Sequence, residues 1–510
     1  MLGRFAFVIL FLLPATLRAE WHEASRDNFL VVADQSERDV RAFAERLERY
    51  HAALMSVLNQ PNQKPSPSNR VTIYVVKSGA DVRKLAGDKS GFLQGFYQPR
   101  AGGSLAFISR VESGGREVDD SERILFHEYA HHVMHSTNEW STPRWLSEGF
   151  AEFYSTVRFE RDGGVSVGLP ANHRGYELAL ARNVGIEALL DAATYDKTKT
   201  KAYDEFYGRS WALYHYLLVS QKRPGQLVNY MVALANGASE LDAARTAFGD
   251  LKQLEKELDS YIRQSRWSYI PIAASKISIG PINSRKMRPA EAAIMPVVLE
   301  SKRGVNEETA KAVLAKAQAV AALHPADPAV QAALAEAEYD AGNHQAAVDA
   351  ADRALAVDPK TINAHVQKIY ALGAMAETAQ ESAPAWKKAQ RAVSALNKIE
   401  ADHPIPLIYY YRNLRTAGEP VTELAVFGLE RALQLAPYDQ RVRWDVVQQM
   451  MDDQQWAMAY RILMPLANNP HNRGEDNEAA KLLATLKGKL QPTKPETTEI
   501  DSGAETATPS

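Results

Sequence analysis

The sequence predicts an α+β domain followed by an all-α repeat domain, and three observations lead to this fold class. Short β-branched runs such as Val71–Val76 alternate with helical patterns in the first part of the chain. The second part is dominated by helical spacing, and prolines mark helix ends there at a nearly constant interval. At 510 residues the chain is also too long for one ordinary core.

The composition excludes several classes of protein. With 45% hydrophobic and 24% charged residues, the chain can bury real cores. Its formal net charge of −3 gives no global positive field, so nucleic acid is not an expected partner. It has no cysteine, which excludes disulfides and thiolate metal sites. Any metal ion must therefore be bound by histidines and carboxylates.

Residues 1–19 have the layout of a secretory signal peptide. One arginine precedes the apolar run Phe5–Leu13, and small residues lead to a cleavage site before Glu20. The alternative is a membrane anchor, but the run is about half of the roughly 20 residues that a spanning helix needs. We therefore expect a protein secreted across the inner membrane, in a bacterial periplasm or outside the cell, with no stable membrane span after cleavage.

Residues 20–264 form the predicted α+β domain. Strands are expected at Asn28–Asp34, Val71–Val76 and Ser104–Ile108, and a helix at Ser36–Leu58. The sequence Asp119-Asp120-Ser121-Glu122 is typical of a capping box, which predicts a helix start and a helix running to about Ser136. From there to about residue 264 the pattern is mostly helical. Residues 265–304 are rich in proline and glycine and are expected to be an irregular linker.

Residues 305–490 have an internal repeat. Prolines at 325, 359, 404, 437 and 470 are separated by 34, 45, 33 and 33 residues. Three of these intervals match the period of about 34 that is typical of tetratricopeptide helix–turn–helix repeats. Asp327–Pro359 resembles such a repeat, with small residues where paired helices approach, and the resemblance implies a solenoid that binds a protein partner. The alternative is a generic alanine-rich bundle. Residues 491–510 are expected to be a disordered tail.

The motif His127-Glu128-Tyr129-Ala130-His131 has the spacing of a metal site. Two histidines four residues apart lie on one face of a helix, so both imidazoles can reach one ion. Glu128 lies beside that site and can accept a proton from metal-activated water. A third ligand is needed. His135 would lie too far along the helix axis from His127 to share a tetrahedral ion, and His132 points to another face.

The third ligand is expected in the segment 143–154, PRWLSEGFAEFY. Its aromatic and aliphatic residues predict a buried helix, where a carboxylate is costly unless it is paired or binds a metal. Glu148 and Glu152 are four apart and share a face. One can bind the metal while the other accepts a hydrogen bond from a ligand imidazole. The alternative is that both are ordinary exposed residues.

The combination of HEYAH and WLSEGFAEF resembles the signature of gluzincin metallopeptidases, the clan of thermolysin and aminopeptidase N. The resemblance implies a zincin-like fold with a mixed sheet, the HExxH helix and a helical lower lobe. It also implies Zn²⁺ bound by His127, His131 and Glu148, hydrolysis of peptide bonds by zinc-activated water with Glu128 as general base, and Glu152 supporting a ligand from behind. The interval between His131 and Glu148 is two residues shorter than in the aminopeptidases.

Two further segments refine the resemblance. Tyr207-Gly208-Arg209-Ser210 is similar to the helix start at which aminopeptidases place an oxyanion-binding tyrosine, which implies a catalytic role for Tyr207; the alternative is a buried aromatic. The Gly-x-Met-Glu-Asn segment that binds a free amine in those enzymes is missing from Ala101–Phe107. An endopeptidase acting on a peptide or protein substrate is therefore expected, with Ala101–Phe107 as a strand that pairs with extended substrate.

A second hypothesis belongs to another class. The chain can be read as a periplasmic scaffold that binds partner proteins through its repeats, with an inactive or structural zinc site. Glu128 argues against this hypothesis, because a structural site needs no base beside the metal and usually has four protein ligands.

Overall fold

The computed structural model describes residues 20–89, 91, 93–110, 115–137, 142–467 and 477–490. The predicted signal peptide, residues 1–19, and the predicted disordered tail, residues 491–510, lie outside the described residues. Among the described helices none combines the length and the hydropathy that crossing a bilayer requires.

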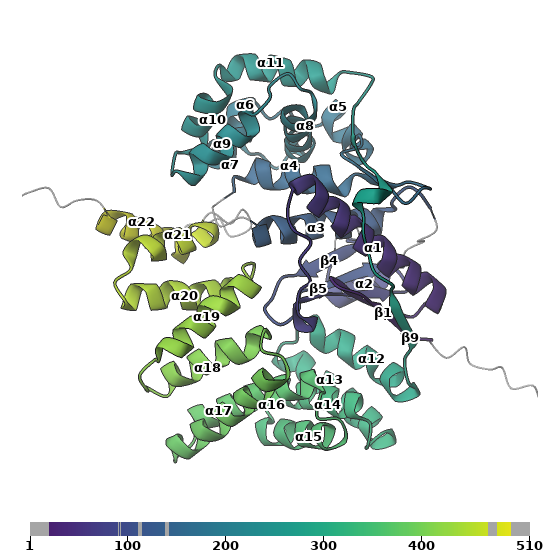
Figure 1. The fold of residues 1–510 in the computed structure, drawn as a ribbon, viewed down its shortest axis with the longest axis vertical. Helices are drawn as coiled ribbons and strands as arrows, with labels where there is room; N and C mark the ends of the chain where they lie inside the picture. Colours follow the sequence, from purple (N-terminus) through teal and green to yellow (C-terminus); the bar gives the residue numbers. More distant parts are fainter. Residues whose placement is uncertain are drawn as a thin grey trace, which may run out of the picture.

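The described part of the N-terminal domain contains a mixed six-stranded sheet in the order β4-β5-β3-β2-β1-β9 (Figure 1). The parallel pairs β2–β3 and β3–β5 form its centre, while β4, β1 and β9 pair antiparallel to their neighbours. The bounds are β1 (His22–Ser25), β2 (Phe29–Ala33), β3 (Val71–Val76), β4 (Gly95–Gln98), β5 (Leu105–Ser109) and β9 (Asn283–Lys286). The three strands predicted from β-branched runs correspond to β2, β3 and β5.

Helices cover both faces of this sheet. On one face α1 (Glu37–Leu58) and α3 (Asp120–Thr137) share the main core with Val31 and Ile73. On the other face α2 (Gly79–Ala86) and α12 (Pro289–Lys302) lie in the core region of Val32 and Phe107. Strands buried on both faces need apolar residues throughout, which is why Val71–Val76 shows no alternation.

Two expectations for this domain are wrong. Residues 265–304, predicted to be an irregular linker, contain two strands and a helix: β8 and β9 each complete a sheet, and α12 covers one. β8 is three residues long and contains Pro271, and β9 consists of four polar residues, so neither has a periodicity that can be read from sequence. The segment proposed to pair with substrate includes part of β5, which is already paired with β3 and β4. The edge of the sheet on this side is β4.

A helical lobe lies beyond α4 (Arg144–Ser155), which packs between α3 and α8 (Figure 1). A small sheet of β6 (Val157–Phe159), β7 (Val165–Val167) and β8 (Ile270–Ile272) joins the lobe to the rest. The helices of the lobe are α5 (Gly175–Leu180), α6 (Ile186–Leu190), α7 (Ala192–Thr198), α8 (Phe206–Val219), α9 (Gln226–Ala235), α10 (Glu240–Phe248) and α11 (Leu251–Ile262).

The second half of the chain is a solenoid of antiparallel helix pairs, as predicted from its repeat. The described helices after α12 are α13 (Glu307–Leu323), α14 (Pro328–Asp340), α15 (His344–Val357), α16 (Ile362–Glu377), α17 (Ser382–Ile399), α18 (Pro404–Thr416), α19 (Glu423–Leu435), α20 (Gln440–Asp452), α21 (Trp456–Ala467) and α22 (Glu478–Leu490). Consecutive helices contact each other along the whole series. The long proline interval, 359 to 404, contains the longest pair, α16 and α17.

The solenoid folds back onto the N-terminal domain and makes specific contacts with it. The Glu400 carboxylate accepts hydrogen bonds from the backbone and hydroxyl of Ser68 at 2.9 and 2.7 Å. The Asp439 carboxylate accepts one from the backbone N–H of Ala101 at 2.7 Å. Gly102 lies against Ile405 so closely that a Cβ there would be 3.0 Å from its side chain. The two halves of the chain therefore have a defined relative position.

Candidate metal centre

The helix α3 is fixed by contacts at its N-terminal half. Asp119 and Glu122 each accept a hydrogen bond from the other's backbone N–H, which is the predicted capping box. The buried Glu122 also pairs with Arg46 of α1 at 2.7 Å. One turn further, the Tyr50 hydroxyl donates to the carbonyl of Phe126. His127 directly follows Phe126, so these contacts between α1 and α3 also fix the position of His127.

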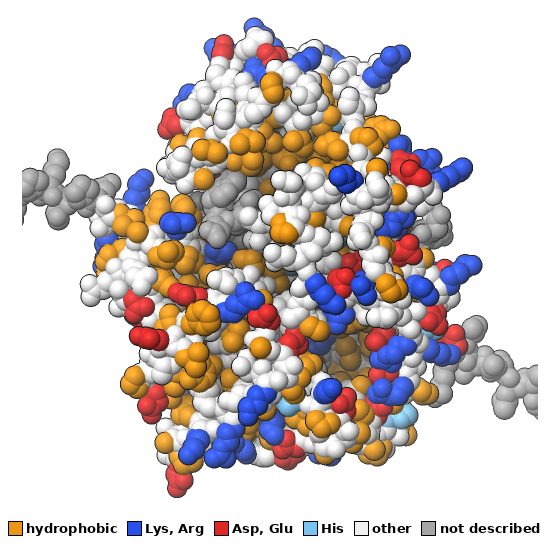
Figure 2. Space-filling model, viewed as in Figure 1, with side chains coloured by type: hydrophobic (Ala, Val, Ile, Leu, Met, Phe, Trp, Pro, Cys, Tyr) orange, Lys and Arg blue, Asp and Glu red, His pale blue; other side chains and the backbone are white. Residues whose placement is uncertain are grey.

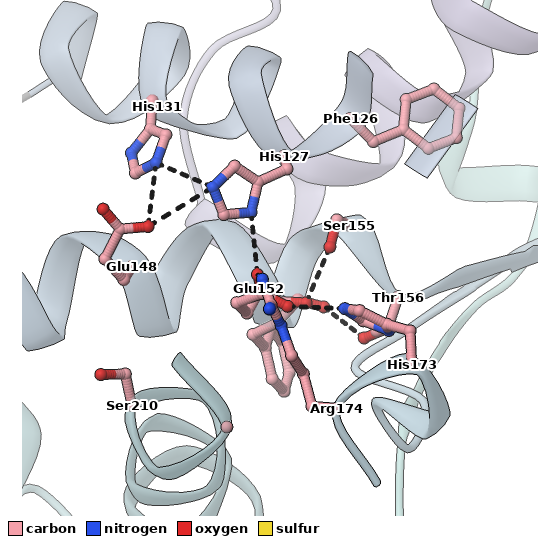
Figure 3. A network of polar contacts seen from close by, with 12 residues as sticks. Phe126, His127, His131, Glu148, Glu152, Ser155, Thr156, His173, Arg174 and Ser210 are labelled. Carbon is pink, nitrogen blue, oxygen red and sulfur yellow. Dashed lines mark hydrogen bonds and ion pairs between the residues drawn. The ribbon is translucent and has the colours of Figure 1, made fainter. Parts of the chain in front are cut away.

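The helix α4 is buried along nearly its whole length, as its aromatic residues predicted. Gly149 permits α8 to approach, because a Cβ at this position would lie 2.5 Å from the backbone oxygen of Ser210. The helix is thus held between α8 and α3. Glu148 and Glu152, one turn apart on α4, are 2% and 1% exposed and point at the imidazoles of α3 (Figure 3).

The side chains of His127, His131 and Glu148 meet in one place. The two Nε2 atoms are 3.2 Å apart, and Glu148 Oε2 lies 3.4 Å from His127 Nε2 and 3.6 Å from His131 Nε2. Zinc bonds of about 2.0–2.2 Å at tetrahedral angles put neighbouring ligand atoms roughly 3.3–3.5 Å apart. Among the described residues this is the group whose donor atoms converge closely enough to bind an ion, and its dimensions fit zinc.

The second ring nitrogen of each imidazole, Nδ1, contacts a side chain of α4. Glu152 Oε1 lies 3.3 Å from Nδ1 of His127, and Ser147 Oγ lies 3.1 Å from Nδ1 of His131. A donor–acceptor contact at Nδ1 leaves the Nε2 lone pair of each ring available to a metal. The structure therefore places Glu152 behind His127, where the sequence analysis expected a supporting acid.

Three supporting residues were not found by the sequence analysis. Ser147 was not considered as a partner of a ligand. His173 Nε2 and Arg174 both contact the Glu152 carboxylate, at 2.8 and 2.5 Å. The WLSEGF motif contains Ser147 and could have suggested it, whereas His173 and Arg174 lie in a three-residue 3-10 helix after β7 (Asn172–Arg174), which is too short to give a periodic signal.

Electrostatics keep the carboxylates of the site ionised. Burial opposes charge on Glu148, but hydrogen bonds from His127 and His131 outweigh it and hold the pKa of Glu148 far below its usual value. The pKa of Glu152 is lowered too: burial opposes this, and His127 and His173 overcome it. Burial likewise disfavours charge on His127, yet Glu148 and Glu152 raise its pKa to about 10. Metal binding at neutral pH would thus displace a proton from His127.

Glu128 directly follows His127 on α3, and Tyr207 is close enough to Glu148 for the charge of that carboxylate to affect its pKa. Glu128 is half-buried. Burial is the main cause of the raised pKa of Tyr97 on β4, and the charges of Tyr438 and Glu128 add to it. Tyr207, at the start of α8, has a pKa raised by burial and then by the charge of Glu148. Its phenol is therefore neutral at pH 7 and can donate a hydrogen bond.

The two other histidines of α3 have different surroundings. His132 Nδ1 shares a hydrogen bond of 2.6 Å with the Tyr97 hydroxyl, and the His132 ring packs on Tyr438 of the solenoid, with ring centroids 4.5 Å apart. Burial lowers its pKa to about 3, so it is a neutral packing residue. His135 stacks on His131 at 6.4 Å and is not part of the converging group.

Comparisons with known proteins identify no family for this chain. No family model matches it, and no curated protein matches it. Among solved structures, a thermophilic tetratricopeptide-repeat protein of Thermus thermophilus, TTC0263, is similar over 39% of this chain and 98% of its own, with 15% identity and a TM-score of 0.32. PilF of Pseudomonas aeruginosa matches 39% of this chain and 90% of its own, at 15% identity and a TM-score of 0.31. Yeast Tom70 matches 71% of this chain and 72% of its own, at 13% identity and a TM-score of 0.27.

Proposed function

We propose that the chain is a zinc-dependent endopeptidase of gluzincin type. The observation that best supports this is the convergence of His127 Nε2, His131 Nε2 and Glu148 Oε2 to within 3.6 Å of one another. Three protein ligands leave the fourth tetrahedral position for water or substrate, as in catalytic zinc sites. Histidine and carboxylate donors suit several divalent ions, and zinc is proposed because the separations of the donor atoms are compatible with it and because of the gluzincin-like motif.

Each residue of the site has a separate task in this reaction. His127, His131 and Glu148 would hold the ion, which when bound supplies Lewis-acid activation of water and of the substrate carbonyl. Glu128 accepts the proton of the attacking water and returns it to the leaving nitrogen as the C–N bond breaks. The neutral phenol of Tyr207 donates a hydrogen bond to the oxyanion that forms on the carbonyl oxygen.

The supporting residues keep this arrangement in place. Arg174 and His173 hold Glu152, Glu152 orients His127, and Ser147 orients His131. Such contacts typically change metal affinity or activity by about 10–100-fold when lost. The Arg174 guanidinium also lies 4.9 Å from the centre of the Tyr207 ring. One of the residues that hold Glu152 is therefore also in contact with the residue proposed to donate to the oxyanion.

A second function, binding of a protein partner through the repeats, is favoured by the surface of the solenoid. Leu424 and Phe427 on α19 are each 67% exposed and lie one turn apart. Hydrophobic side chains also gather on the α21–α22 end of the solenoid (Figure 2). Exposed apolar groups on helical repeats are suited to binding peptides or proteins. A partner at this surface is compatible with peptidase activity and does not replace it.

The test of the peptidase proposal compares purified wild type with Glu128→Gln. Zinc content and hydrolysis of casein are measured for both, with Glu308→Gln on an exposed helix start as the matched control. We expect about one zinc per chain in all three proteins, and a loss of hydrolysis of about 10²–10⁴-fold in Glu128→Gln alone. Zinc-free wild type without activity would refute the proposal and leave the partner-binding function.

A further inference from the structure

Glu177 on α5 is a buried carboxylate that has no part in the mechanism proposed above. Its side chain is 1% exposed, and both of its oxygens accept hydrogen bonds. Oε1 accepts one from the backbone N–H of Gly208 at 2.6 Å. Oε2 accepts one from the Tyr203 hydroxyl at 2.9 Å and one from the Arg174 guanidinium at 3.2 Å. A carboxylate is costly to bury without such donors, so these three contacts fix the position of the Glu177 side chain.

The first of these contacts lies at the start of α8, the helix that carries Tyr207. The first turn of a helix has backbone N–H groups that find no partner inside the helix. The Glu205 carboxylate, directly before α8, accepts from the backbone of Val184 instead. Glu177 binds the N–H of Gly208 from another helix, and a negative charge is favourable at a helix N-terminus. Because Gly208 directly follows Tyr207, this hydrogen bond holds the backbone that carries the phenol.

Gly208 allows α5 to approach α8 this closely. A Cβ at this position would lie 2.8 Å from Cγ of Leu178 and 3.3 Å from Oε1 of Glu177. A larger residue would therefore have to displace Leu178 and weaken the hydrogen bond to Glu177. The glycine that follows Tyr207 in the sequence thus serves the contact between the two helices.

Arg174 connects Glu177 to the candidate metal centre. Its guanidinium donates to Glu177 and to Glu152, the carboxylate that contacts Nδ1 of His127 (Figure 3). The same guanidinium lies 4.9 Å from the centre of the Tyr207 ring, a distance typical of a cation–π contact. Glu177 therefore holds Tyr207 in two ways, through the backbone that follows it and through the arginine on its ring.

We propose that Glu177 is a positioning residue, which keeps the Tyr207 hydroxyl directed at the oxyanion formed at the metal centre. The proposal rests on the peptidase function, because that function supplies the substrate to which Tyr207 donates. Two simpler roles give different results. A residue that only caps α8 changes stability and leaves the rate per folded molecule unchanged, and a residue that only supports the metal ligands changes zinc affinity.

The test is a double-mutant cycle on the full chain, with Glu177→Gln, Tyr207→Phe and the two combined. Glutamine keeps an oxygen that can accept from the backbone but lacks the charge that pairs with Arg174. The control is Glu240→Gln, because Glu240 accepts from the backbone N–H of Ala192 at the start of α7, in the same lobe. For each protein, kcat and KM are measured with a fluorogenic peptide taken from a site that wild type cleaves in casein, together with zinc content and thermal melting.

We expect Tyr207→Phe to lower kcat by about 100-fold and Glu177→Gln to lower it by about 10-fold, with KM and zinc content unchanged. The combined variant should be no slower than Tyr207→Phe, because Glu177 then has no phenol to position. The control should match wild type. A combined loss of about 1,000-fold, loss of zinc in Glu177→Gln, or an unchanged kcat in Glu177→Gln would each overturn the proposal.

A second variant covers the case in which Glu177→Gln does not fold. Tyr203→Phe removes one donor to the same carboxylate, and the Tyr203 side chain is 61% exposed. This substitution should lower kcat by about threefold, and the effect should disappear when Tyr207→Phe is also present. The same loss with and without Tyr207→Phe contradicts positioning through Tyr207.

The surroundings of Tyr207 are also measured without any activity, by fluorine NMR of a fluorotyrosine placed at residue 207. Glu177→Gln should shift this resonance and Glu240→Gln should not. If wild type cleaves no peptide, the peptidase function has failed, and the resonance alone then decides. A shift in Glu177→Gln supports the positioning of Tyr207 by Glu177, and an unchanged resonance overturns it.

Discussion

Two pairs of neighbouring helices, α3 with α4 and α14 with α15, pack by opposite means. The α14–α15 pair buries small side chains, with Ala335, Ala350 and Ala354 fully buried. The α3–α4 pair brings charged and ionisable groups together, and Glu148 and Glu152 are buried against imidazoles. Alanine packing needs only close approach, whereas a buried carboxylate needs every partner in place. Alanine packing can therefore be repeated along a chain, whereas the packing of buried charged groups forms one specific site.

The largest effect on stability is expected when a polar residue that anchors α3 is replaced. In Arg46→Met the buried Glu122 loses its ion-pair partner, and we expect the N-terminal domain to lose about 3–5 kcal/mol of stability. Hydrogen exchange of the α3 amides, followed by mass spectrometry, measures this loss. Arg38→Met is the control on the same helix, because the Arg38 side chain is 92% exposed. Recovery of stability in Arg46→Met with Glu122→Leu would attribute the loss to the unpaired carboxylate.

Acid should destabilise the N-terminal domain, because this domain buries neutral histidines. His51 accepts from the Tyr129 hydroxyl, and His215 lies against the Tyr261 hydroxyl. Burial lowers the pKa of each to about 4, although hydrogen bonds to Asn62 and to backbone carbonyls oppose the shift. Below the unfolded pKa of about 6.5 the unfolded chain binds more protons than the folded one, so stability falls as the pH decreases.

Between pH 6.5 and 4.5 each of these histidines should cost about 2 kcal/mol of stability. Urea unfolding of wild type and His51→Gln across this range measures the effect. Glutamine does not titrate, so the variant should lose less stability on acidification than wild type. The same pH dependence in both proteins would show that His51 is not buried as the neutral form.

A smaller effect on stability is expected when the alanine interface between α14 and α15 is overpacked. Ala354 on α15 is fully buried, and Ala354→Leu inserts three carbons where two helices touch. Overpacking of this kind costs about 1–3 kcal/mol. Ala356→Leu, two residues away on the exposed side of α15, should change stability by less than about 0.5 kcal/mol. Hydrogen exchange of α14 and α15 measures both. Equal effects of the two substitutions would mean that α15 does not pack through Ala354.

The difference between these regions also explains what could be predicted from the sequence. The helix pairs follow from local signals, such as Pro359 after α15 and Gly342 in the turn before it, and the capping box at Asp119 fixed the start of α3 in the same way. The spacing of the histidines in HEYAH and the burial of Glu148 can likewise be predicted from short stretches of sequence. All of these are properties of neighbouring residues.

What the sequence analysis missed depends on contacts between distant segments. The strand β9 is assigned only by pairing with β1, more than two hundred residues earlier. His173 and Arg174 support Glu152 from a 3-10 helix of only three residues, so no period identifies them. The packing of Tyr438 on His132 requires the solenoid to fold back onto α3. No local pattern in the chain encodes any of these three arrangements.

The smallest effect is expected at the two residues that support the candidate metal centre, Ser147 and Glu152. Ser147 contacts His131 through a neutral hydroxyl, whereas Glu152 contacts His127 through a carboxylate that Arg174 and His173 also hold. A neutral hydrogen bond contributes about 0.5–1.5 kcal/mol, so Ser147→Ala should weaken zinc binding by about 2–10-fold. Glu152→Gln removes a charge and should weaken it by about 10–100-fold. Competition with a chelator measures both affinities. If Ser147→Ala equals or exceeds Glu152→Gln, the order of the two supports is reversed, and the position of His131 rather than the charge behind His127 limits zinc affinity.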